Sequence, residues 1–216
     1  MPTEDVFDLG EHLRDGLWRV DSAALPDLRG VPGVAVVGEA PALAGARLAL
    51  AEPSKPVRFG EAAEDALVVC LSYDGQDAAA LAALQAARGP VVVATTGGPL
   101  GAAAREAGHK VVPIPAGFTP ESALGYWVSI TAELLARAGA QPGRQAEIEA
   151  AADAVEALAG RWSGSAPTSA ELVEALAAAR SSVLGDGDTA LQNVLSAVLL
   201  VDVVIHHLGS SAGVGP

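Results

Sequence analysis

Polar side chains that could bind a ligand lie at the ends of two apolar runs of the sequence, 66–71 and 90–96. The residues at these two places are Ser72, Asp74, Gly75, Asp77, Thr95 and Thr96. Hydroxyls and backbone N–H groups in a turn can cradle an anion such as phosphate, whereas carboxylates repel an anion and attract a cation. The two kinds of side chain therefore favour ligands of opposite charge.

The turns that hold these residues need strands and helices around them. A short apolar run that ends in turn residues and is followed by a helical pattern predicts a buried parallel strand. The predicted strands are 34–37, 57–59, 66–71, 90–96 and 110–115. The predicted helices are 4–24, 42–51, 77–88, 99–107, 122–138, 145–162, 169–180 and 189–208.

Strands and helices alternate in the first part of the chain, and only helical patterns follow residue 120. This order predicts an α/β fold, with a single parallel sheet flanked by helices, an N-terminal helix and a helical C-terminal part. We expect an α/β domain with the N-terminal helix over 1–140, a helical extension packing on it over 141–208, and a tail over 209–216. Ligands of open parallel sheets sit at the carboxyl ends of the strands, so the turn at 72–77 is the first place to seek function.

Composition narrows the class of protein. The chain has 216 residues, half of them apolar, and a formal net charge of -13, which disfavours nucleic acid and anionic membrane surfaces as partners. Its one cysteine, Cys70, lies inside an apolar run, which favours a free buried thiol in a reducing compartment. No signal-peptide pattern opens the sequence and no apolar run could span a membrane. We expect a cytoplasmic protein with no membrane partner, cofactor or metal.

Several segments resemble the bifunctional phosphoglucose/phosphomannose isomerases, which are built from sugar isomerase (SIS) domains. The segments that carry the resemblance are 12–20, 68–77, 94–98, 117–126 and 187–202. The stretch 117–126, Gly-Phe-Thr-Pro-Glu-Ser-Ala-Leu-Gly-Tyr, is the most specific, since the family writes Gly-x-Gln-Pro-Arg-x-Ala-x-Gly-Tyr there. The resemblance implies a SIS-type fold and aldose–ketose isomerisation of sugar phosphates.

The resemblance also shows what this chain lacks. The family has two sheet domains, whereas the room between Trp162 and Thr189 holds one helix and two loops. A second sheet domain would need on the order of 100 residues. The family's catalytic glutamate and histidine lie in that second lobe, around an Asp-His-Asn-Glu segment that is missing here. We therefore predict no catalytic residue and the loss of isomerase activity.

Replacements in the family's phosphate-binding turns point the same way. Pro41 stands in place of a serine, within a stretch that begins at Glu39; Asp74 and Asp77 replace a serine and a threonine, and Glu121 replaces an arginine. Each carboxylate repels a phosphate charge by about 1 kcal/mol at ~4 Å in water. The predicted ligand-binding residues of this degenerate cleft are Glu39, Ser72, Asp74, Gly75, Asp77, Thr95, Thr96 and Glu121. The carboxylates are either helix caps in a disused site or part of a cleft that binds a cationic or metal-bound ligand.

The last predicted helix, 189–208, is apolar on nearly every side and needs cover all round. Because the second lobe is missing, we expect a homodimer or a protein partner that covers residues 190–205 and 4–24.

The leading hypothesis is a SIS-type pseudoenzyme that acts in assembly or binds a carbohydrate derivative other than a phosphosugar. The alternative is an active sugar-phosphate isomerase whose site is rebuilt across an oligomer. A third hypothesis is a metal- or amine-binding module that uses Asp74, Asp77 and Glu121. An anion at 72–77 would favour the enzyme, a cation the third hypothesis, and a cleft filled by side chains the assembly role.

Overall fold

The structure, a computed structural model, describes residues 8–162, 168, 170–171, 173–177, 191–192 and 194–199. The chain divides into two compact units, one of residues 15–145 and the other of residues 1–14 with 146–216. Its elements are α1 (Leu9–Ser22), β1 (Val34–Gly38), α2 (Ala40–Leu48), β2 (Val57–Phe59), β3 (Leu67–Leu71), α3 (Ala78–Ala86), β4 (Val91–Thr95), α4 (Gly98–Glu106), β5 (Lys110–Pro113), α5 (Leu124–Arg137) and α6 (Gln145–Trp162).

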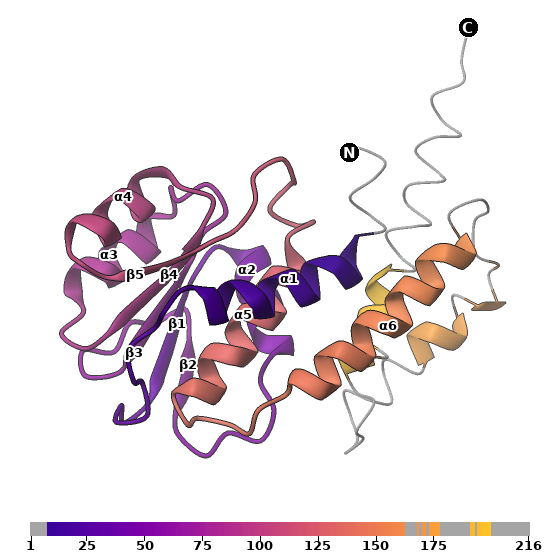
Figure 1. Ribbon diagram of the computed structural model, residues 1–216, viewed down its shortest axis with the longest axis horizontal. Helices are drawn as coiled ribbons and strands as arrows, with labels where there is room; N and C mark the ends of the chain where they lie inside the picture. The colour runs from indigo at the N-terminus through magenta and orange to yellow at the C-terminus, as the bar shows by residue number, and fades with distance from the viewer. Residues whose placement is uncertain are drawn as a thin grey trace, which may run out of the picture. The chain divides into compact units, whose positions relative to one another are not determined.

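The five strands form one parallel sheet in the order β2-β1-β3-β4-β5. The predicted α/β fold, a single parallel sheet flanked by helices, is confirmed (Figure 1). Strand β2 leads to β3 through residues 60–66 without a helix. The chain order reverses between β1 and β3, and the crevice beside such a reversal is the usual ligand position in open α/β sheets.

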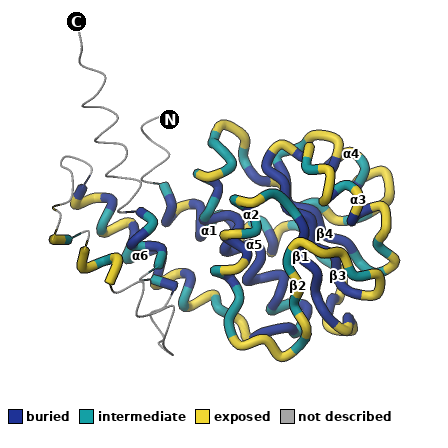
Figure 2. The backbone as a smooth tube through the Cα atoms, turned by 180° about the vertical axis from the view of Figure 1, so that it is seen from behind, coloured by how far each residue is buried: buried dark blue, intermediate teal, exposed yellow. Residues whose placement is uncertain are grey.

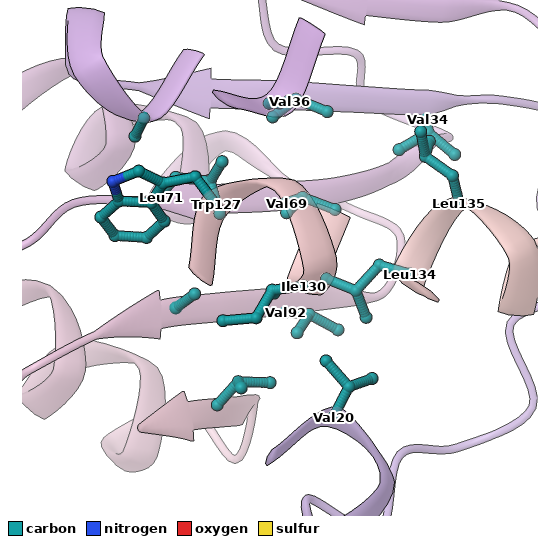
Figure 3. Packing of buried hydrophobic residues seen from close by; sticks show 14 of the residues in the cluster. Val20, Val34, Val36, Val69, Leu71, Val92, Trp127, Ile130, Leu134 and Leu135 are labelled. Atoms are coloured by element: carbon teal, nitrogen blue, oxygen red, sulfur yellow. The ribbon is translucent and has the colours of Figure 1, made fainter. Parts of the chain in front are cut away.

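Each face of the sheet is covered by its own helices, because successive side chains of a strand point to opposite faces. Helices α3 and α4 cover the face of Val68, Cys70 and Val93. The other face packs against α2, α5 and the second half of α1 (Figure 3). Its packed residues include Val20, Val34, Val36, Val69, Leu71, Val92, Trp127, Ile130, Leu134 and Leu135.

Helix α5 is the most deeply buried helix of this unit, and Figure 2 shows it buried along most of its length. Every residue from 125 to 135 is buried. Glycines allow the neighbouring helices to come close: a Cβ on Gly16 of α1 would lie 2.0 Å from Ser129 Oγ, and one on Gly45 of α2 would lie 2.6 Å from Trp127 Cβ. Small residues at these two positions therefore set the spacing of α1, α2 and α5.

Two predicted boundaries need correction. The helix predicted over 42–51 lies earlier in the chain, because α2 begins at Ala40, with Pro41 in its first turn, and ends at Leu48. Proline is tolerated there, since the first N–H groups of a helix have no partner within it. Helix α5 begins at Leu124, two residues later than predicted, so Glu121 precedes the helix.

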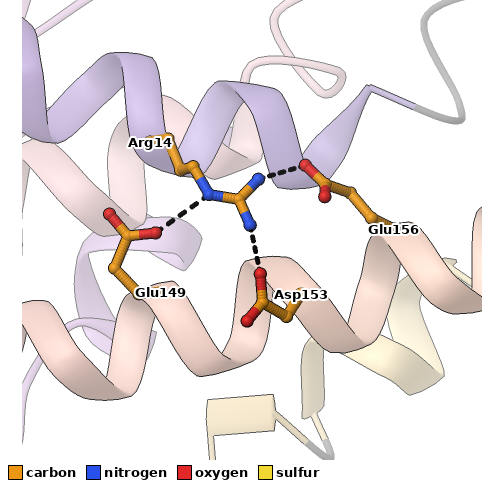
Figure 4. A network of polar contacts seen from close by, with 4 residues as sticks. All are labelled: Arg14, Glu149, Asp153 and Glu156. Carbon is orange, nitrogen blue, oxygen red and sulfur yellow. Dashed lines mark hydrogen bonds and ion pairs between the residues drawn. The ribbon is translucent and has the colours of Figure 1, made fainter.

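The other unit contains the first half of α1 together with α6. Helix α6 buries Ile148, Ala152, Val155 and Ala159 at spacings of three and four, as an amphipathic helix does. Beside this buried stripe, the side chains of Glu149, Asp153 and Glu156 all contact Arg14 of α1 (Figure 4). Hydrogen bonding to Glu156 and Glu149 raises the pKa of the Arg14 guanidinium, against the effect of its desolvation.

Short stretches after α6 complete the description. Thr168 and Glu171 form a capping box: the Thr168 N–H donates to Glu171 Oε2 at 2.8 Å and the Glu171 N–H to Thr168 Oγ1 at 3.3 Å. Residues 170–171, 173–177, 191–192 and 194–199 are helical, and Leu195 is fully buried. The remainder of the predicted helices 169–180 and 189–208, residues 4–7 of the first helix, and the tail 209–216 lie outside the described residues. No helix in the described part of the chain is long and apolar enough to cross a membrane.

Candidate functional site

The sheet register brings three of the predicted turns together at its carboxyl edge. Gly38 at the end of β1 pairs with Leu71 at the end of β3, and Leu71 pairs with Ala94 near the end of β4. The residues that follow these strand ends are therefore neighbours in space. Glu39 follows β1 and Ser72 follows β3, so these two flank the position where the chain order reverses.

The Glu39 carboxylate bridges that position. Its Oε1 accepts the backbone N–H of Tyr73 at 2.5 Å, across 34 residues of sequence. Glu39 is the residue that precedes α2, but its side chain makes no capping hydrogen bond to that helix. The carboxylate therefore links the β1–α2 turn to the β3–α3 turn.

The hydroxyls of the site bond to the backbone of their own turn or of the neighbouring turn. Ser72 Oγ is buried and accepts the Asp77 N–H at 3.3 Å. Thr96 Oγ1 donates to the Tyr73 carbonyl at 2.8 Å, and Thr95 Oγ1 lies 3.2 Å from the same carbonyl and 3.0 Å from the Gly97 carbonyl. The Thr96 N–H donates to that Tyr73 carbonyl as well, at 2.9 Å. These hydroxyls hold the β3–α3 and β4–α4 turns together.

Asp74 and Asp77 also have local partners. Asp77 Oδ1 accepts the Ala80 N–H at 2.7 Å, so Asp77 is the N-cap of α3, as its position in the sequence indicated. Asp74 is exposed and accepts the Gln76 N–H at 3.0 Å and the Gln76 side-chain amide at 3.3 Å.

Four carboxylates share this edge. Burial raises the pKa of Glu39, the Tyr73 N–H opposes that shift, and the negative charges of Asp74, Asp77 and Glu121 raise the pKa further. Glu121 therefore acts on the same site, although it is exposed and lies on the β5–α5 loop. Among the described residues, no group of three or more His, Cys, Asp or Glu side chains is arranged to hold a metal ion. Burial and the nearby Asp77 raise the pKa of Cys70 to about 12.

Tyr73 is the residue of this site that sequence reasoning missed. Its ring is buried, and its phenol oxygen accepts the Phe118 N–H at 2.7 Å, which fixes the β5–α5 loop. Tyr73 thus contacts three other segments: it meets Glu39 through its N–H, Thr95 and Thr96 through its carbonyl, and Phe118 through its hydroxyl. The only sequence signal was a tyrosine placed between two of the predicted site residues.

Glycines permit the close approach of the two turns. Gly75 has φ +72°, and a Cβ there would lie 2.1 Å from the Gly97 carbonyl oxygen. Gly98 has φ +65°, and a Cβ there would lie 2.0 Å from the Asp74 carbonyl oxygen. A side chain at either position would push the turns apart, which gives the predicted site residue Gly75 a structural role.

A hollow of about 260 Å³ lies at the opposite, amino-terminal edge of the sheet. Its lining residues are Pro32, Gly33, Val34, Pro56, Arg58, Ala63, Glu64, Asp65 and Ala66. None of the predicted site residues lines this hollow.

Comparison with known proteins shows the fold more clearly than the function. No family model and no curated protein matches the sequence. The structure is similar to a candidate phosphosugar isomerase from Silicibacter pomeroyi DSS-3, with a TM-score of 0.53 and 17% identity, over 88% of this chain and 66% of that one. It is also similar to a hypothetical protein from Thermus thermophilus, with a TM-score of 0.50 and 18% identity, over 95% and 48% of the two chains. The chain thus spans two thirds or less of the length of these structures.

These similarities define the fold. The chain shares with the Silicibacter pomeroyi structure an α/β fold, which here is a single parallel sheet flanked by helices. At 17–18% identity they identify the fold and leave the reaction and the ligand undetermined.

Proposed function

We propose that this chain is a SIS-type protein, related to the phosphoglucose/phosphomannose isomerases, that has no isomerase activity and acts in binding or assembly. The observation that carries the proposal is the state of the polar groups at the carboxyl edge. The hydroxyls of Thr95 and Thr96 are bonded to the Tyr73 carbonyl of the neighbouring turn, and Ser72 Oγ accepts the Asp77 N–H of its own turn. A sugar phosphate would have to break the two threonine bonds before those hydroxyls could donate to it.

The charge of the edge supports the same proposal. A phosphate dianion at this position would meet Glu39 and the three carboxylates that act on it electrostatically, Asp74, Asp77 and Glu121. Each carboxylate costs about 1 kcal/mol per charge pair at ~4 Å in water, and several-fold more where water is partly excluded. A carbohydrate derivative that binds here would therefore carry no phosphate.

Assembly is the second part of the proposal. We infer a homodimer or a protein partner that covers residues 4–24 and 190–205. Trp18 supports this, because it is 61% exposed on α1 whereas Trp127 and Trp162 are buried. Exposed tryptophans are enriched at protein interfaces, where they contribute a large share of the binding energy. We place the protein in the cytoplasm, because its cysteine, Cys70, is free and buried.

The test is a direct assay for turnover. The chain is incubated with glucose 6-phosphate, fructose 6-phosphate or mannose 6-phosphate, and the three sugars are followed by proton NMR. We expect no interconversion above the rate without protein. Turnover proportional to the amount of protein would instead favour the alternative function, an isomerase whose site is rebuilt across an oligomer.

A further inference from the structure

The Glu39–Tyr73 contact lies where an open α/β sheet usually binds its ligand. The chain order of the sheet reverses between β1 and β3, and Glu39 and Tyr73 come from the turns after these two strands. Helices α2 and α3, which follow the two turns, cover opposite faces of the sheet. The crevice between such turns is where ligands reach the sheet, and here a side chain of the protein crosses it.

The turn after β3 offers backbone donors at this place. The Tyr73 N–H is taken by the Glu39 carboxylate at 2.5 Å. In the described part of the chain, no hydrogen bond uses the N–H groups of Asp74 and Gly75, the next two residues. Successive backbone N–H groups in a turn favour a bound anion. The group that occupies the first of them is an anion, and it belongs to the chain.

We propose that Glu39 is an internal plug, a carboxylate that occupies the Tyr73 N–H and so excludes external anions from the turn at 73–75. This inference rests on the proposed function, since it explains how a SIS-type edge loses its affinity for phosphate. Displacing the plug would leave the Tyr73 N–H without an acceptor and would move a charged group of the protein.

The other acidic groups near the turn do not fill this role. Asp74 bonds to Gln76, and Asp77 caps its own helix at Ala80, so each carboxylate stays within its own turn. Glu39, by contrast, bonds to a different segment of the edge. The charged groups that act on Glu39 are Asp74, Asp77 and Glu121, all acidic, so none of them draws its carboxylate away from Tyr73.

Three variants distinguish occupation of the Tyr73 N–H by Glu39 from general repulsion of anions by the negative charge of this edge. Glu39→Ser removes it, and serine is a favoured residue at the position before a helix, so α2 keeps its start. Glu39→Gln removes the charge but keeps an oxygen that can accept the Tyr73 N–H. Asp74→Asn removes one charge from the same edge and leaves Glu39 in place. The experiment is thermal unfolding of the full chain and each variant at pH 7.5, in sodium sulfate and in sodium chloride of equal ionic strength.

Sulfate also stabilises folded proteins in general by exclusion from their surface. We therefore expect the Tm difference between sulfate and chloride to be several degrees larger for Glu39→Ser than for wild type, Glu39→Gln and Asp74→Asn. An equal sulfate effect in wild type and Glu39→Ser would overturn the plug. So would an equal gain in all three variants, because charge alone would then explain it. A folded Glu39→Ser, shown by circular dichroism, that gains nothing from sulfate would also overturn it.

The sulfate experiment and the test of the proposed function can fail independently of each other. Turnover of sugar phosphates by the wild type would contradict the proposed function, whichever variants bind sulfate. A failure of the sulfate prediction would remove the plug and leave the absence of isomerase activity to be decided by the NMR assay.

Discussion

At the scale of single residues, Glu39 makes the stability of the folded state depend on pH. The pKa of Glu39 is raised, mainly by burial and further by its acidic neighbours. The folded state therefore holds the proton of Glu39 more tightly than the unfolded state does. Its contribution to stability is greatest below the ordinary pKa of glutamate and is lost as pH rises through the raised pKa.

Glu39→Gln should remove the loss of stability that accompanies ionisation of Glu39. We expect the variant to have a higher free energy of unfolding than wild type at pH 7 and the same one at pH 4, where Glu39 is protonated. Because Glu39 is only half-buried, solvent screening keeps the gain modest. Urea unfolding at the two pH values measures it, and a variant that equals wild type at both would contradict the raised pKa of Glu39.

Gly98 should tolerate no side chain. Gly98→Ala places a methyl group at a positive φ and 2.0 Å from the Asp74 carbonyl oxygen. Gly108→Ala is a matched control, because Gly108 has φ +76° but no atom lies within 4 Å of the place that its Cβ would take. Both variants carry about 1–2 kcal/mol of backbone strain, and overpacking adds about 1–3 kcal/mol at Gly98 alone. Equal losses in denaturant unfolding would show that the two turns do not need close approach.

Sequence reasoning found the local roles of residues and missed the long-range ones. Asp77 was predicted as a helix-start residue because an N-cap bonds to an N–H three residues on, which a sequence displays. The Glu39–Tyr73 bond joins residues 34 positions apart, and its existence depends on the sheet register. The predicted ligand-binding role of these residues remains a prediction.

At the scale of elements, the hydroxyl of Tyr73 holds the β5–α5 loop against the carboxyl edge of the sheet. Tyr73→Phe removes the acceptor of the Phe118 N–H, at a cost of about 1 kcal/mol. We expect faster hydrogen exchange at Phe118 and its neighbours. Tyr126→Phe is the control, since it keeps the ring that lies 6.2 Å from the Phe118 ring and removes only a hydroxyl bond of similar length, 2.9 Å to Asp15. Unchanged exchange at Phe118 in Tyr73→Phe would show that other contacts hold the loop.

The elements themselves were largely predictable. Strands β1, β3 and β4 are continuous apolar runs that are buried throughout or nearly so, as both faces of a parallel sheet require. Helix α6 has the predicted bounds because its apolar residues keep a helical spacing. The start of α2 was missed because Pro41 resembles a turn residue, whereas it lies inside the first turn of the helix.

At the scale of the whole molecule, the proposal requires association. We expect sedimentation velocity at micromolar concentration to show a homodimer, or a complex where a partner protein is supplied. Burial of four large apolar side chains is worth about 6–12 kcal/mol, enough to decide assembly. Trp18→Ser should weaken the association without lowering the stability of the fold, because Trp18 is largely exposed. A monodisperse monomer that binds no partner would contradict this part of the proposal.

The proposed function requires above all that the carboxyl edge of this sheet does not bind sugar phosphates. Thermal unfolding with and without millimolar glucose 6-phosphate, fructose 6-phosphate and mannose 6-phosphate tests this most directly. A ligand at 100 times its Kd would stabilise the fold by about 2.7 kcal/mol, a shift of several degrees. We predict no shift with any of the three beyond that of sodium chloride at equal ionic strength. A clear shift with one of them would contradict the proposed function and make the rebuilt isomerase the leading one.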